Sequence, residues 1–344
     1  MKSATALRSV MTRSVPAIAA LAAVSIGAAA AAQQTQPPSF STTTRTVAVY
    51  ATVTNPGGRI VTDLMRDDFA VDDNGKRQTL TTFANDIQPI TAVVLLDRSS
   101  SMKPSFDLEA QGAEAFVRAM GGDDKLRIGS FANQIQIDPV DFSSDKDALL
   151  RILRTGLQEP GPTPLWNAVN AGIDKLLLEK GRRVVVVFTD GVDRPLNFAT
   201  HNKSLKDVMK RAEEDDVMIY AIGLAGNNGM PGSGDRRAPT GIGPGAFGGL
   251  GGRGLGGYNS RNPELEGPDE GLPKIAAATG GGYFELKTPA TLASTFTRVA
   301  NELHHQYVLG FAPEKLDGKM HEITVHVSQA QFVVRARKRY LASR

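Results

Sequence analysis

"VVLLDRSSSM", residues 93–102, is a run of large apolar residues that stops at one acid and continues into hydroxyl side chains. The apolar run begins at Ile90, and residues 182–191, "RRVVVVFTDG", show the same change from a Val-rich stretch to an acid. Unbroken Val, Ile and Leu runs of this length are typical of strands covered on both faces, as in a parallel sheet. The two stretches therefore predict core strands that each end in an aspartate.

Helical patterns alternate with apolar strand patterns between residues 89 and 306. Amphipathic helices are expected in "FDLEAQGAEAFVRAM", "DKDALLRILRTG", "PLWNAVNAGIDKLLLEKG", "SLKDVMKRAEEDD" and "TLASTFTRVANELHHQ", and further strands in "LRIGSF" and "VMIYAIGL". Strands that alternate with helices in this way imply a mostly parallel sheet with helices on both faces. Residues 89–306 are therefore predicted to form a doubly wound α/β domain.

The flanks of this α/β region have the sequence pattern of short antiparallel strands joined by tight turns. Residues 41–88 contain an alternating run around Val47 and Val49 and an Asn74-Gly75 hairpin signal, and residues 307–344 contain a further turn signal at Asp317-Gly318. Because the ends of a domain often lie close together, the two flanks are predicted to pack against each other as one small β-domain.

Residues 225–271 are rich in Gly and Pro and nearly free of large apolar side chains. Such a segment cannot offset its ordering entropy by burial, so it is predicted to be a disordered insertion in the α/β domain. Its "GGLGGRG" stretch is a poor match to a dinucleotide-binding fingerprint, because no strand leads into it and no helix follows directly.

Residues 1–32 have the pattern of a secretory signal peptide, with three cations, a short apolar stretch and an alanine run. The apolar stretch is shorter than the roughly 20 residues that span a bilayer, so cleavage is favoured over a retained anchor. We expect export to the periplasm or the exterior, with no stable membrane span after cleavage and a linker at residues 33–40.

The charge of the chain argues against nucleic-acid binding. Three of the 39 Lys and Arg residues lie in residues 1–32, which leaves 36 against 36 Asp and Glu residues. The basic footprint of a nucleic-acid-binding protein is therefore missing. One basic cluster remains in the final strand, where a solvated edge is expected: Arg335, Arg337, Lys338 and Arg339. The chain has no cysteine, which excludes disulfides, zinc thiolate sites and thiol catalysis.

Acids and hydroxyls gather at the predicted carboxyl ends of the strands, which is where doubly wound sheets bind ligands. If the two core strands are neighbours, side chains from three loops meet in one crevice. This all-oxygen set is the kind that hard divalent cations prefer, so a Mg²⁺ or Mn²⁺ site is predicted. For the threonine alone, capping of the next helix is the alternative. The predicted ligands are Asp97, Ser99, Ser101, Thr163 and Asp190.

These five positions resemble the metal-ion-dependent adhesion site of von Willebrand factor type A domains, which reads Asp-x-Ser-x-Ser followed by a distant Thr and a distant Asp. The flanks look like those of an exported bacterial group related to these domains. The resemblance implies that the hydroxyls contact the metal directly or nearly so, that the acids act largely through water, and that a partner's carboxylate completes the shell. Many members have glycine at the position of Ser100, a small departure from the pattern.

Other polar or aromatic residues near these motifs have simpler explanations. Asp193 is expected to be a surface acid, and Trp166 either a core residue or part of the site rim. His304 and His305 are adjacent on a helix and cannot both face one ion, so they are expected to be solvated or packed.

The function expected from this pattern is an adhesion-type protein–protein interaction module that captures an acidic group of a partner, and not an enzyme. An envelope scaffold with a stabilising metal is the first alternative. A metal-assisted hydrolase with Asp97 as nucleophile is the second, although no P-loop, no Gly-x-Ser-x-Gly and no histidine adjoins the acids. The oligomeric state is left open.

Overall fold

The computed structural model describes residues 46–190, 193–194, 202–225, 269–287 and 289–343. The chain divides into two compact units, Met1–Gln36 and Pro37–Arg344, and every described residue belongs to the second. The predicted signal peptide and linker lie outside the described residues, as does the predicted insertion except at its two ends.

No helix of the described residues combines the length and the apolar content needed to cross a membrane.

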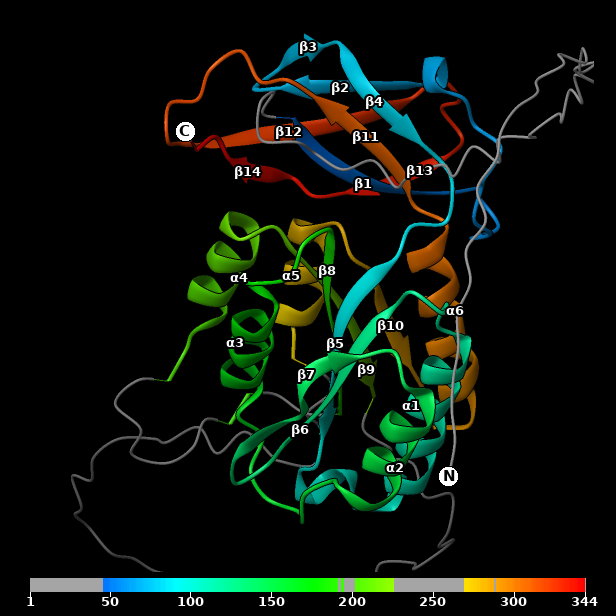
Figure 1. Cartoon of the computed structure of the whole chain (residues 1–344), viewed down its shortest axis with the longest axis vertical. Coiled ribbons are helices and arrows are strands. Elements are labelled where there is room, and N and C mark those ends of the chain that lie inside the picture. The colour runs from blue at the N-terminus through cyan, green and yellow to red at the C-terminus, as the bar shows by residue number, and fades with distance from the viewer. Residues whose placement is uncertain (1–45, 191–192, 195–201, 226–268, 288, 344) are drawn as a thin grey trace, which may run out of the picture. The chain divides into compact units, whose positions relative to one another are not determined.

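A six-stranded sheet forms the centre of the α/β domain, as the sequence predicts (Figure 1). Its strand order is β10-β9-β8-β5-β6-β7, and all neighbours are parallel except β7, which runs antiparallel to β6. The strands are β5 (Ile90–Asp97), β6 (Lys125–Phe131), β7 (Ile135–Ser143), β8 (Arg182–Thr189), β9 (Val217–Leu224) and β10 (Tyr283–Leu286).

The edge strand β7 is not anticipated by the sequence analysis. Its side chains are half-buried or exposed, and Pro139 interrupts its short alternating pattern. Proline within a run argues against a strand unless the strand lies at an edge, and only the assembled sheet reveals that β7 does.

Helices cover both faces of this sheet, and each face has its own apolar core (Figure 1). Because successive side chains of a strand point to opposite faces, Val94 and Leu96 pack in one core and Val93 and Leu95 in the other, all without solvent exposure. The first core includes α1 (Phe106–Ala119), α2 (Lys146–Thr155) and α6 (Leu292–His304). The second includes α3 (Leu165–Leu176), α4 (Leu205–Glu214) and α5 (Gly271–Thr279).

Strands from the two flanks form two four-stranded sheets that share a third apolar core. Both flanks contribute to both sheets, whose orders are β13-β1-β11-β4 and β14-β12-β2-β3. The turn predicted at Asn74-Gly75 is confirmed, because both residues have positive φ, 49° and 78°, as a tight hairpin requires. The N-terminal strands are β1 (Val47–Thr54), β2 (Phe69–Asp73), β3 (Lys76–Gln78) and β4 (Leu80–Ala84). The C-terminal strands are β11 (Tyr307–Phe311), β12 (Met320–Val327), β13 (Val333–Ala336) and β14 (Arg339–Leu341).

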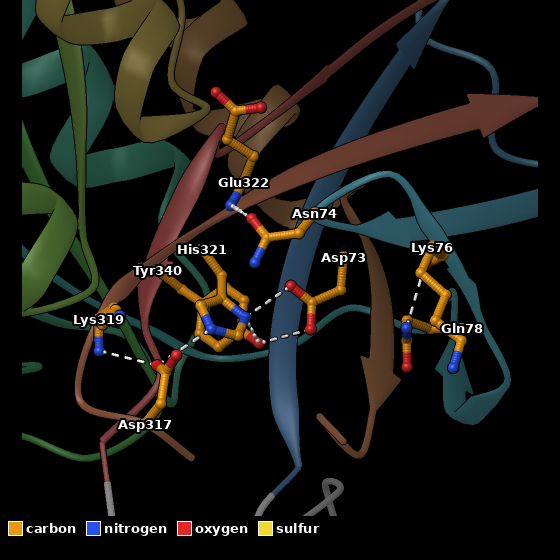
Figure 2. Close-up of polar contacts among 9 residues, drawn as sticks. All are labelled: Asp73, Asn74, Lys76, Gln78, Asp317, Lys319, His321, Glu322 and Tyr340. Carbon is orange, nitrogen blue, oxygen red and sulfur yellow. Dashed lines mark hydrogen bonds and ion pairs between the residues drawn. The ribbon is translucent and has the colours of Figure 1, made fainter. Parts of the chain in front are cut away.

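A buried polar cluster lies between β2, β12 and β14 (Figure 2). His321 Nδ1 lies 2.8 Å from Asp73 Oδ1, and its Nε2 lies 3.2 Å from Asp317 Oδ1. The Tyr340 hydroxyl donates to Asp73 Oδ2 over 3.0 Å. Nothing in the local sequence marks this cluster, because its members come from opposite ends of the chain.

The edge position expected for the basic cluster is confirmed, since β13 and β14 are outermost strands of their sheets, but the expected solvation without partners is wrong for three of its four residues. Each of the three arginines forms an ion pair with an acid of the α/β domain, whereas Lys338 is exposed and forms none within the described residues. The sequence contained the cations, but their acidic partners lie on distant helices and loops. The pairs are Arg335 with Glu302, Arg337 with Asp216, and Arg339 with Glu213.

Candidate metal centre

The central pairing of β5 with β8 brings two acids to one edge of the sheet. The strands are parallel, with Leu96 opposite Phe188. Asp97 is the last residue of β5, and Asp190 directly follows β8. The chain leaves β5 through Ser99 into a short 3₁₀ helix, η2 (Ser100–Ser105). The carboxyl ends of both strands therefore open onto the same group of hydroxyls.

Four of the five predicted ligands form one continuous hydrogen-bonded cluster. Asp97 Oδ1 accepts the Ser99 backbone N–H over 2.8 Å. Ser99 Oγ lies 3.1 Å from Ser101 Oγ, which in turn donates to Asp190 Oδ1 over 3.0 Å. The cluster thus links the ends of β5 and β8 through two serine hydroxyls.

Thr163 lies in the adjacent loop, and the described contacts include no hydrogen bond between its hydroxyl and the other four residues. The loop is nevertheless tied to the site, since Ser100 N donates to Gly161 O and Gly161 N donates to Arg98 O, each over 3.1 Å. The N-cap of α3 is Pro164, so capping does not explain Thr163. Its side chain is buried, two residues from the backbone bridge between Ser99 and Gly161.

Thr189 is a site residue that the sequence analysis missed. It is the last residue of β8, has no solvent exposure, and donates its hydroxyl hydrogen to Asp97 Oδ2. Both oxygens of Asp97 are therefore engaged, one by the Ser99 amide and one by Thr189. The available signal was a hydroxyl residue ending an otherwise apolar run in "VVVVFTDG".

The two acids are held where their charged forms are disfavoured. Burial raises the pKa of Asp97 to about 7, against hydrogen bonds from Thr189 and Ser99 that lower it, and the nearby Asp190 adds a smaller increase. Burial also raises the pKa of Asp190, although the hydrogen bond from Ser101 opposes this. A cation close to both carboxylates would reverse these shifts, because an opposite charge favours the ionised form.

The donor set fits a hard divalent cation. It consists of carboxylate and hydroxyl oxygens, the ligand type that Mg²⁺ and Mn²⁺ prefer. The described part of the chain contains no group of three or more His, Cys, Asp or Glu side chains placed to share a metal. Any metal at this edge would therefore depend on neutral hydroxyls as well as on the two acids.

A third acid near Asp97 was also missed. Glu109 in α1 has no solvent exposure, and its Oε2 lies 3.4 Å from Arg98 Nη1. Burial raises the pKa of Glu109 well above its usual range, Asp97 adds to this increase, and Arg98 opposes it. The sequence signal that could have identified Glu109 is its spacing along the helix. It lies three, four and seven residues before Gly112, Ala113 and Phe116, on the same buried face of α1.

The remaining candidates are structural. Asp193 Oδ1 accepts the backbone N–H of Trp166 over 3.2 Å and thus holds the first turn of α3, while the Trp166 side chain is a core residue. His304 is buried with its Nε2 2.6 Å from Asp124 Oδ2. His305 Nδ1 lies 2.7 Å from the Asn301 carbonyl oxygen.

The match to a known protein family lies within the α/β domain. Residues 92–236 match the family model of the von Willebrand factor type A domain. No curated protein matches the chain.

Three similar solved structures illustrate the range of matches. An aerotolerance-related membrane protein from Bacteroides fragilis NCTC 9343 is 17% identical, with a TM-score of 0.41 over 62% of this chain and 98% of that one. A von Willebrand factor type A protein from Catenulispora acidiphila is 11% identical, with a TM-score of 0.44 over 80% and 73%. Proximal thread matrix protein 1 from the mussel byssus, with a zinc-occupied MIDAS motif, is 16% identical, with a TM-score of 0.45 over 68% and 50%.

Proposed function

Since the chain contains a von Willebrand factor type A domain, we propose that it acts as an exported protein–protein interaction module whose binding depends on a divalent metal ion. One observation carries the proposal: Asp97, Ser99, Ser101 and Asp190 form a single cluster of oxygen donors at the carboxyl edge of the sheet. The captured group on the partner would be a carboxylate.

The residues of the cluster have distinct roles in this proposal. Ser99, Ser101 and Thr163 would offer hydroxyl oxygens to the ion, and Asp97 and Asp190 would supply the negative charge that holds it. Because the hydroxyls are neutral, the bound ion would keep positive character and attract an acidic group from outside. Ser101 is exposed, which supports access from solvent at this edge.

The ion would be Mg²⁺, with Mn²⁺ as the alternative. Both accept oxygen ligands, whereas zinc sites in proteins usually contain nitrogen or sulfur ligands. None of the four described histidines contacts Asp97 or Asp190. The same observation supports binding over metal-assisted hydrolysis, since no imidazole base of the described residues adjoins the acids.

The direct test is calorimetric titration of the purified chain with Mg²⁺ and Mn²⁺, followed by capture of envelope proteins with and without chelator. Asp97→Ala should fold yet lose both metal binding and metal-dependent capture. Ser294→Ala, which changes an exposed serine on α6, should keep both. Capture by wild type that is equally strong in chelator would refute the proposal.

Two further parts of the proposal have their own measurements. Export predicts that residues 1–32 are absent from the mature protein, which the mass of the chain purified from the cell envelope would reveal. A purely structural metal would instead produce a large metal-dependent rise in melting temperature without any metal-dependent partner, because a ligand that binds only the native state stabilises it by mass action.

A further inference from the structure

A cavity of about 870 Å³ lies at the amino ends of β5, β6 and β8. These are the ends of the strands opposite to the metal centre, since β5 begins at Ile90 and ends at Asp97. Tyr50 of β1 and Val308 of β11 also line the cavity. Its size is within the range of pockets that hold small organic molecules.

A buried arginine lines this cavity and has no counter-ion among the described residues. Arg182 is only 2% exposed, and within the described residues it forms no ion pair. Its Nη1 donates to Gln306 Oε1 over 3.0 Å and its Nη2 to the Gln88 carbonyl oxygen over 2.7 Å, while Nε has no hydrogen-bond partner in the described part of the chain. A buried charge without an opposite charge is costly, so this position is suited to an anion.

The register of the sheet gathers more cations around Arg182. Thr91 of β5 lies opposite both Lys125 of β6 and Arg183 of β8. Lys180, in the turn before β8, also lines the cavity. The lining acids are Asp123 and Glu179, so four cations face two acids and the cavity is formally positive. None of these cations forms an ion pair with another described residue.

The remaining lining includes the apolar or aromatic side chains of Tyr50, Ile90, Leu178 and Val308. The Arg182 guanidinium carbon lies 5.4 Å from the centre of the Tyr50 ring. Leu178, in the turn directly after α3, also lines the cavity and is 94% exposed. A ligand with an aromatic or aliphatic body could cover Tyr50 and Leu178 while its charged end approaches Arg182.

We propose that this cavity binds a small organic anion, with a carboxylate or phosphate group directed at Arg182 and an apolar body against Tyr50 and Leu178. Burial lowers the pKa of Arg182 from its ordinary value, although Tyr50, Tyr220 and Asp124 oppose this decrease. The site is independent of the proposed metal centre, which lies at the other end of β5.

The test is calorimetric titration of the full-length chain in EDTA with four probes: benzoate, phenyl phosphate, inorganic phosphate and uncharged benzyl alcohol. EDTA removes divalent ions, so that a carboxylate cannot bind at the metal centre instead. Benzoate or phenyl phosphate should bind, and comparison between them identifies the preferred head group. Inorganic phosphate should bind more weakly because it lacks the apolar body, and benzyl alcohol should not bind.

Variants then assign the binding to the cavity. Arg182→Gln should abolish binding of the organic anion. If Arg182→Gln does not fold, the double variant Lys125→Gln with Lys180→Gln, at two exposed positions, still tests the site and should weaken binding roughly tenfold. Lys274→Gln, an exposed change on α5 outside the cavity, should have wild-type affinity, and Asp97→Ala should retain binding. Undiminished binding in the double lysine variant, equal binding of benzyl alcohol, or no binding of either organic anion would overturn the proposal.

Discussion

Thr189 donates its hydroxyl hydrogen to Asp97 across two neighbouring parallel strands, although 92 positions separate them in the chain. The contact exists because β5 and β8 are paired in a register that ends both strands at the same edge. It orients a buried carboxylate whose other oxygen is held by the Ser99 amide. Thr189 is therefore a positioning residue for the candidate metal centre.

Thr189→Val should lower the affinity for Mg²⁺ or Mn²⁺ by roughly 10- to 100-fold, as loss of outer hydrogen bonds to metal-binding groups usually does. The replacement keeps the branched shape but removes the donor to Asp97. Calorimetric titration measures the effect. Thr295→Val, which removes a hydroxyl bonded only to the carbonyl oxygen of Thr291, the N-cap of its own helix, serves as the control, and equal affinities in the two variants would contradict the assigned role.

Asp124 should make folding stability depend on pH in the acid range. Burial alone would raise the pKa of Asp124, but hydrogen bonds from His304 and from the Ile90 and Gly121 amides lower it below its usual value. A lowered folded-state pKa contributes stability that is present above the unfolded pKa of about 3.9 and is lost as pH falls through the folded value.

Asp124→Asn should therefore lower the free energy of unfolding most at pH 5 and above, by about 1–3 kcal/mol, and the difference from wild type should shrink below about pH 4. Urea unfolding between pH 3 and pH 6 measures this. Asp123→Asn, at the exposed neighbouring position, should show little effect. A difference between wild type and Asp124→Asn that grows as the pH falls would have the wrong sign.

Tyr340→Phe should destabilise the β-domain by about 1–3 kcal/mol, because the buried Asp73 loses a hydrogen-bond donor (Figure 2). Ring packing is retained, so the loss reports the hydroxyl alone. Urea denaturation compares this variant with Tyr283→Phe, whose hydroxyl makes no hydrogen bond within the described residues. Equal stability of the two variants would show that the hydroxyl of Tyr340 contributes nothing.

Arg339→Met should destabilise the chain by about 1–3 kcal/mol, since Glu213 is only 4% exposed and loses its paired donors. Lys338→Met, the neighbouring exposed position, should be nearly neutral. Adding Glu213→Met to Arg339→Met should recover part of the loss, because an apolar pair avoids the unpaired buried charge. No recovery in the double variant would show that the pair itself is not responsible.

Local patterns in the sequence identified the elements that carry the candidate site. The apolar runs at Ile90 and Val184 indicate buried strands, and the acid and serines after the first run lie within five residues of each other. The spacing of apolar residues along the chain and the residue types found in turns are local properties, so they can be recognised without knowing which strands pair. The predicted α/β class is confirmed for this reason, while the half-exposed β7, with Pro139 inside it, was overlooked.

The sequence by itself determined the alternating α/β pattern, the β-rich flanks and an all-oxygen set of candidate ligands. Only the tertiary structure decided that Thr189 contacts Asp97, that buried Glu109 lies near the same site, that Arg182 Nε has no hydrogen-bond partner among the described residues, and that three C-terminal arginines form ion pairs. The physical reason is that each of these facts depends on which distant segments are paired and in which register. Pairing between segments 92 or 126 residues apart, as for Asp97 and Thr189 or Glu213 and Arg339, leaves no periodic signal along the chain.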